Sequence, residues 1–165
     1  MSYFAAALAR TDDGWVGEEL ELDDVADLDA LADVLRDLAD DSKGPSLLLF
    51  EEDDEYLAVV RVDGGARGLD DPRVFLSDRR AVLGSDVAAM LWPEGSDDGA
   101  GDDEEDSGRP VVEPVGDAQL LADLGTPGDE LLRLSAEEGL LPADVLTGLC
   151  ERAGCLDVLE ELREV

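Results

Sequence analysis

The order of apolar and polar residues at the start of the chain predicts a β-hairpin followed by a helix. In the first strand-like segment the residues that share one side are apolar: Phe4, Ala6 and Leu8. Asp13-Gly14 marks the hairpin turn, because such turns need a positive φ that glycine supplies. Between Val25 and Ala39 apolar residues recur at i, i+3, i+4 and i+7, which predicts an amphipathic helix ending before Gly44-Pro45.

A second group of apolar runs predicts three more strands and a helix. The runs Leu47–Phe50 and Tyr56–Val62 are separated by acidic residues and form a second expected hairpin, and Arg73–Leu76 is a short further strand. Ser77 then suits the N-cap of a helix that continues to about Leu91 and is broken or bent near Gly84. The resulting order, β-β-α-β-β-β-α, is compatible with one antiparallel sheet that carries helices on one face, an α+β architecture.

The C-terminal part of the chain has helical spacing. Thr126, Pro127 and Asp129 suit the N-cap, the first helical position and the capping-box position of one helix, and Pro142 begins another. A last short helix is expected around three leucines: Leu156, Leu159 and Leu162. A helical unit of about 50 residues is only marginally stable alone, so it is expected to pack on the first domain or on a partner.

These elements divide the chain into three expected parts. Residues 1–93 form an α+β domain, residues 94–110 an acidic flexible linker, and residues 111–165 a small helical domain. The linker contains GSDDGAGDDEEDSG, whose like charges repel and which has nothing to bury, so a disordered spacer is favoured. A tail that occupies a basic groove is the alternative. A calcium loop is not supported, because the third ligand position falls on Gly99 or Ala100.

The net charge of −32 limits the class of partner. A field of this sign repels nucleic acid and anionic membranes and attracts basic proteins, so neither direct nucleic-acid binding nor membrane binding is expected. The sequence has no recognisable secretory signal or membrane span, which indicates a cytoplasmic protein. The same composition is also typical of GC-rich genomes and of salt-adapted proteomes, so the charge has two explanations. The pattern does not specify an oligomeric state.

The residues that usually carry catalysis are scarce. The sequence has no histidine, which excludes triads and histidine acid–base pairs, and it lacks a phosphate-binding loop. Cys150 and Cys155 are five residues apart, about 140° around a helix, so they are not expected to share a face. The helix that begins at Pro142 is expected to end near Gly154, which separates the two cysteines into two segments, and both are interpreted as buried thiols. We therefore predict a protein that is not an enzyme and that holds no metal or cofactor.

Two small groups of residues are candidates for binding. Arg73, Arg79 and Arg80 form a basic cluster. This cluster either contacts an anion or acidic peptide of a partner or pairs with acids of its own chain. Pairing within the chain is favoured, because three acids are near in sequence: Asp70, Asp71 and Asp78. If a partner interface exists, its first candidates are the aromatic residues of the hairpins, whose alternative role is in the core: Trp15, Tyr56 and Phe75.

Five phrases in one order carry a family resemblance: MSYFAAALARTDDGW, EEDDEYLAVVRVDG, DPRVFLSD, PVGDAQLLADLGTP and EEGLLPADVL. Together they resemble the tRNA adenosine deaminase-associated proteins of high-GC Gram-positive bacteria. The chain is not the deaminase itself, because it lacks the H-x-E and P-C-x-x-C zinc motifs. The resemblance implies a non-catalytic accessory protein that binds and modulates a tRNA adenosine deaminase. The alternatives are an acidic competitor of tRNA on a basic partner surface, or an interaction module unrelated to deamination.

Overall fold

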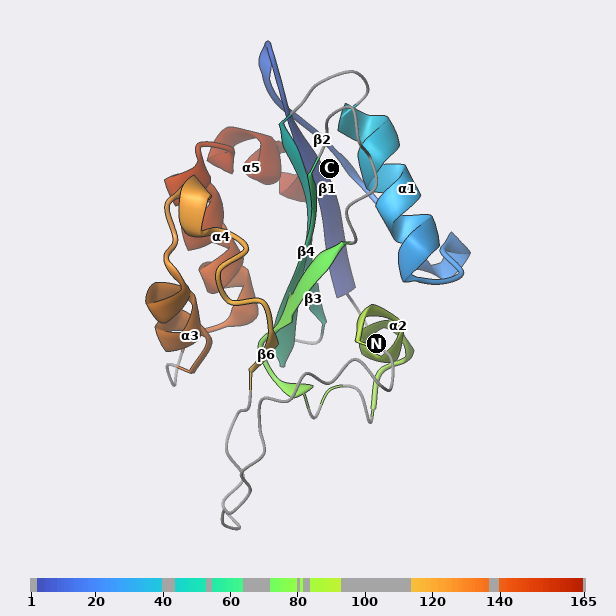
Figure 1. Cartoon of the computed structure of the whole chain (residues 1–165), viewed down its shortest axis with the longest axis vertical. Helices are drawn as coiled ribbons and strands as arrows, with labels where there is room; N and C mark the ends of the chain where they lie inside the picture. Colours follow the sequence, from blue (N-terminus) through green and yellow to red (C-terminus); the bar gives the residue numbers. More distant parts are fainter. Residues whose placement is uncertain are drawn as a thin grey trace.

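The computed structural model describes residues 3–39, 44–52, 55–63, 72–79, 81, 84–92, 114–136 and 140–164, and its centre is a six-stranded sheet (Figure 1). Neighbouring strands are antiparallel, in the order β2-β1-β3-β4-β5-β6. The strands are β1 (Tyr3–Thr11), β2 (Gly14–Glu19), β3 (Pro45–Glu52), β4 (Tyr56–Asp63), β5 (Arg73–Leu76) and β6 (Val115–Gly116). The helices are α1 (Leu28–Ala39), α2 (Asp86–Leu91), α3 (Gly128–Ala136), α4 (Pro142–Ala153) and α5 (Leu156–Glu164), with short 3-10 turns η1 (Leu22–Asp24) and η3 (Ala122–Leu124). The predicted α+β class is confirmed.

Both predicted hairpins are present. In the first, Gly14 has a φ of +122°, and the Thr11 hydroxyl donates a hydrogen bond to the Gly14 carbonyl oxygen at 2.7 Å. β3 pairs with β4 over the whole length of both strands, and β5 has the bounds that the sequence predicts. Local turn chemistry and apolar runs are therefore sufficient to locate these strands.

Each face of the sheet carries its own hydrophobic core, because successive residues of a strand point to opposite faces. Ala5 and Ala7 of β1 belong to the first core, whereas Ala6 and Leu8 belong to the second. α1 and α2 cover the first face, and α3, α4 and α5 cover the second (Figure 1). Burial on both faces explains why the segment LLLF is continuously apolar instead of alternating.

The C-terminal helices pack on the sheet of their own chain, an outcome that the sequence left open. Leu131 of α3, Leu146 of α4 and Leu159 of α5 are all 0% exposed in the core of the second face. Pro142 begins α4 as predicted, and Gly154, with φ of +90°, ends it. The sheet is thus a middle layer between two helical layers.

The helix start predicted at Ser77 was wrong. α2 begins at Asp86, and its N-cap is Ser85, whose hydroxyl oxygen accepts a hydrogen bond from the Ala88 amide. Ser77 is instead buried beside β4, where its amide donates to the Leu57 carbonyl oxygen and its hydroxyl accepts from the Leu57 amide. These two bonds continue the β4–β5 pairing by one residue, which is incompatible with an N-cap.

The start of α3 also differs from the prediction. Thr126 is 1% exposed, and its hydroxyl forms no hydrogen bond within the part of the chain that the structure describes. α3 begins at Gly128, one residue after the predicted first helical position, Pro127. The side chain of Thr126 is therefore placed by burial and does not cap the helix.

β6 is a strand that the sequence analysis did not identify. Its residues, Val115 and Gly116, pair with Leu76 and Phe75 of β5. Gly116 has a φ of +103°, and a Cβ atom there would lie 2.1 Å from the Val74 carbonyl oxygen, so only glycine fits. This close approach seats the returning chain against the edge of the sheet. The acidic segment 94–110 and the glycine-rich loop 64–68 lie outside the described residues.

Candidate functional site

The three aromatic candidates do not form one surface. Tyr56 is 4% exposed in the core of the first face, and Phe75 is 1% exposed in the core of the second. Trp15, in β2, has intermediate exposure and packs against the second core. A role in partner binding stays a prediction for all three, and Trp15 is the one whose side chain a partner reaches without opening a core.

A buried polar cluster joins the second hairpin to α2, and the sequence analysis missed it. The Glu52 carboxylate, 7% exposed for the whole residue, accepts hydrogen bonds from the Tyr56 hydroxyl at 2.7 Å and from the Ser85 hydroxyl at 2.6 Å. Because Ser85 is also the N-cap of α2, the cluster holds that helix on the first face. Glu52 lies in a run of acids, so only the strand register distinguishes it from the others, such as the exposed Glu55.

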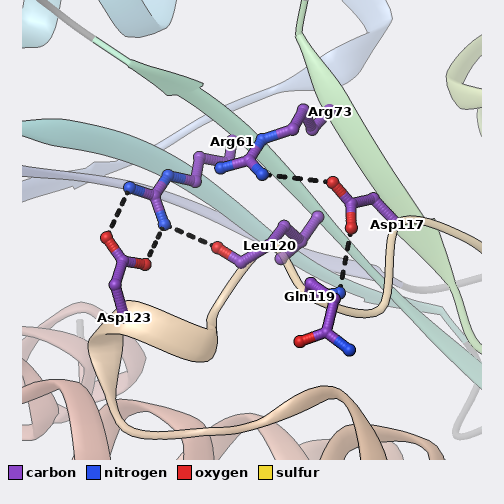
Figure 2. Close-up of polar contacts among 6 residues, drawn as sticks. All are labelled: Arg61, Arg73, Asp117, Gln119, Leu120 and Asp123. Carbon is purple, nitrogen blue, oxygen red and sulfur yellow. Dashed lines mark hydrogen bonds and ion pairs between the residues drawn. The ribbon is translucent and has the colours of Figure 1, made fainter.

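Two arginines on the second face lie directly opposite each other, Arg61 on β4 and Arg73 on β5. Like charges in this position repel, so the pair needs counter-charges. Figure 2 shows that both come from the segment after β6: Asp123 contacts Arg61, and Asp117 contacts Arg73. Arg73 pairs with an acid of its own chain, as predicted, but the partner is Asp117, which is distant in sequence, and not one of the neighbouring acids. Asp70, Asp71 and Arg80 lie outside the described residues.

Arg61 is the more deeply buried member, with its side chain 6% exposed. Its guanidinium donates to both carboxylate oxygens of Asp123, at 2.6 and 3.0 Å, and to the Leu120 carbonyl oxygen at 2.6 Å (Figure 2). The hydrogen bond from Arg61 is the main reason that the pKa of Asp123 lies below its ordinary value. The planar guanidinium of Arg61 donates several hydrogen bonds in fixed directions. It therefore positions the segment 117–124 more specifically than apolar contacts do.

The two cysteines are free and buried, as predicted. The prediction that they do not share a face was wrong, because Gly154 reverses the chain after α4 and the Cys155 amide donates to the Cys150 carbonyl oxygen at 2.9 Å. A hydrogen bond between the thiols, together with burial, raises the pKa of Cys150, and the same bond lowers the pKa of Cys155. Both side chains belong to the second core, so we interpret the pair as structural.

Most arginines of the described residues are engaged with carboxylates of the same chain. Ion pairs join Arg36 to Asp33, Arg61 to Asp123, Arg73 to Asp117, Arg133 and Arg152 to Glu130, and Arg163 to Glu51. Many other acids are exposed, among them a group at the first hairpin: Asp12, Asp13, Glu18 and Glu19. Most arginines among the described residues are therefore paired within the chain, whereas many carboxylates remain exposed.

Two other features, a metal site and a membrane-spanning helix, are absent from the described residues. No three cysteine, aspartate or glutamate residues among them are arranged to hold a metal ion. Within the same residues, none of the helices has both the length and the apolar character needed to cross a membrane. The candidate functional feature of this part of the chain is its acidic surface.

Comparison with known proteins identifies the family. No curated protein and no solved structure shows significant similarity to the chain. A family model described as Rv3753c-like tRNA adenosine deaminase-associated protein matches residues 3–156. This match covers all six strands of the sheet and α1 to α4, so it includes the first core and all of the second core except the part that α5 contributes after residue 156. The chain belongs to the Rv3753c-like tRNA adenosine deaminase-associated protein family.

Proposed function

We propose that this protein is a non-catalytic accessory protein that binds a tRNA adenosine deaminase through a basic surface of that enzyme. The distribution of charge in the fold is the observation that carries the proposal. Arginines are held by acids of the same chain, as in the Arg61–Asp123 and Arg73–Asp117 pairs, while other carboxylates face solvent. A surface of this kind attracts and orients a basic protein partner.

Two features argue against catalysis by the chain itself. The full sequence has no histidine and no P-C-x-x-C, so it lacks the ligands of a zinc deaminase. The hydroxyl of Ser85, which contacts a carboxylate, is already used to cap α2 and to bond Glu52. The chemistry of the described side chains is that of packing and recognition.

The identity of the partner rests on the family description, which names association with a tRNA adenosine deaminase. An enzyme that acts on tRNA needs a positively charged surface to hold the phosphate backbone. The acidic chain complements such a surface and itself repels tRNA, with a net charge of −32. On this proposal the protein acts in the cytoplasm, on the enzyme and not on the RNA.

Calorimetric titration of the purified deaminase tests the proposal. We expect heat of binding without tRNA and the same binding when tRNA is already present, because an accessory subunit has to occupy a basic area outside the tRNA contact. Loss of the heat in the presence of tRNA would identify a competitor on the basic face. An unrelated protein of similar negative charge is the control, and equal heat from that control, or no heat from this chain, would contradict the proposal.

A further inference from the structure

We propose that the outer edge of β2 is a strand-addition site for an extended, lysine- or arginine-rich segment of the partner protein. This inference rests on the proposed function, because it assigns the surface by which the basic partner is held. The site is the backbone of β2 at one end of the sheet, and its occupant is one extended segment of the partner. Strand addition is a general mode of recognition in which main-chain hydrogen bonds supply affinity and side chains supply specificity.

The hydrogen-bond register shows which groups of β2 face outward. The Leu20 amide donates to the Ala5 carbonyl oxygen at 2.9 Å, so Ala5 and Leu20 form a hydrogen-bonded pair. In an antiparallel ladder such pairs alternate with pairs that are not bonded to each other. With the register of β1 and β2, Val16 and Glu18 bond to β1, whereas the backbone N–H and C=O groups of three residues point away from the sheet: Trp15, Gly17 and Glu19.

These outward groups are uncovered within the part of the chain that the structure describes. β2 is the terminal strand, pairs with β1 on its inner side, and makes no backbone hydrogen bond on its outer side to any described residue. α5 packs on one face of β2, where Gly17 leaves room for Val158, and this supports the strand without blocking its edge. On the other face, Val16 is 40% exposed. The edge is therefore supported by α5 on one face and has no partner strand among the described residues.

The charge around this edge indicates a basic occupant. Glu18 and Glu19 of β2 are exposed, as are Asp12 and Asp13 of the adjoining turn. The helix that packs on β2 adds further exposed acids: Asp157, Glu160 and Glu161. Arg10 of β1, directly opposite Trp15, is an exposed cation of the same hairpin, but the acids outnumber it. Opposite charges on neighbouring strands attract, so this excess of acids favours a basic added strand.

A second copy of this chain fits the edge poorly. Acidic residues on an edge strand protect it against pairing with its own kind, and each copy brings a net charge of −32. The opposite edge of the sheet, β6, is only two residues long and offers few backbone groups. The six-residue β2 strand is thus the edge suited to a foreign, positively charged strand.

Amide exchange measured by NMR on the labelled full chain tests the proposal residue by residue. With the deaminase bound, we expect exchange to slow at Trp15, Gly17 and Glu19, and to change little at Val16 and Glu18, whose amides are already bonded. A short peptide of alternating lysine and valine is the second probe and is expected to give the same alternation. Alternating protection in the free chain that grows with its concentration would instead show pairing of copies and overturn the proposal.

Comparison of the variants Glu19→Pro and Glu19→Ala isolates the contribution of the outward main-chain N–H to the binding affinity. Both variants remove the same charge, but proline also removes the outward N–H without breaking a bond to β1. We expect Glu19→Pro to bind the deaminase about threefold to tenfold more weakly than Glu19→Ala. Equal affinity of the two variants would contradict strand addition.

The two probes separate failure of this inference from failure of the proposed function. If the deaminase binds while the three outward amides still exchange freely, the edge proposal is overturned and the accessory function stands. If the deaminase does not bind but the basic peptide protects the three amides, the edge site stands and the accessory function fails. If neither probe binds, both are overturned.

Discussion

The two faces of the sheet are covered in different ways. The first face is covered by α1, which packs on β1, β3 and β4, and by α2, both of which come before the acidic segment in the chain. Its core is built from apolar residues, with the Glu52 cluster at the start of α2. The second face is covered by helices that reach the sheet only after the acidic segment. There, Arg61 and Arg73 bind acids of the returning chain. Apolar burial is not directional, so a distant segment needs such polar contacts to fix its position.

A further polar contact on the second face supports this comparison. Arg163 of α5 donates to the Thr147 hydroxyl of α4 at 2.9 Å and lies 3.7 Å from the Glu51 carboxylate of β3. Its guanidinium carbon is also 5.3 Å from the centre of the Phe4 ring. One side chain therefore joins two helices to two strands. The second face depends on arginine contacts at several points.

Truncation of a buried leucine on either face has the largest expected effect. Leu35→Ala on the first face and Leu159→Ala on the second each remove a side chain that is 0% exposed, and each is expected to lower the free energy of unfolding by about 2–5 kcal/mol. Because α5 shares a core with the strands, we expect one cooperative transition in both variants. Chemical denaturation followed by far-UV and tryptophan signals measures both quantities.

The same measurement tests the predicted division into domains 1–93 and 111–165. A Leu159→Ala variant whose helical signal is lost at lower denaturant than its tryptophan signal would show that the helical unit unfolds alone. That result would weaken the account in which the second face is an integral part of the fold.

The Arg61–Asp123 pair gives the next largest effect, and it is asymmetric. Asp123→Ala leaves the buried guanidinium without its bidentate carboxylate, so we expect a loss of about 1–3 kcal/mol. Arg61→Met removes the buried charge itself and leaves Asp123, 64% exposed, to be hydrated, so a loss under about 1 kcal/mol is expected. Equal losses in the two variants, measured by denaturation, would show that the contact does not depend on burial of the arginine.

The range of each interaction along the chain explains which features the sequence predicted and which it did not. The strands β1 to β5, the hairpin turn at Gly14 and the helix boundaries at Pro142 and Gly154 depend on local patterns, and the sequence predicts them. The contacts of Arg61 and Glu52 depend on register and on partners far along the chain. No local pattern specifies such pairs, so the polar contacts that fix the helical layers were missed.

The errors at helix starts have a related cause. Ser77 has the residue type of an N-cap, but continuation of the β4–β5 pairing uses its backbone and hydroxyl instead. Thr126 is similarly placed by burial. Local preference was overruled in both cases by packing. The Cys150–Cys155 contact was missed because the break at Gly154 was predicted, but not that the turn there brings the two thiols together.

The dependence of stability on pH is the smallest expected effect. The pKa of Asp123 is lowered from its ordinary value of 3.8, so its contribution is fully present above that pH and is lost as the pH falls through the lower folded-state pKa. The difference in stability between the wild type and Asp123→Asn should therefore shrink below about pH 4. Denaturation curves of both proteins from neutral to acidic pH measure it, and a constant difference would contradict the Arg61–Asp123 assignment.

The dependence of affinity on salt tests the central claim most directly, namely that the acidic surface serves to bind a basic partner. The measurement is the Kd of the complex with the tRNA adenosine deaminase, by calorimetry without tRNA, at several NaCl concentrations. We predict binding that weakens about tenfold or more between about 0.05 and about 0.5 M NaCl, as screening removes the attraction. Binding that is constant across this range, or absent at low salt, would contradict the claim and leave the charge explained by composition alone.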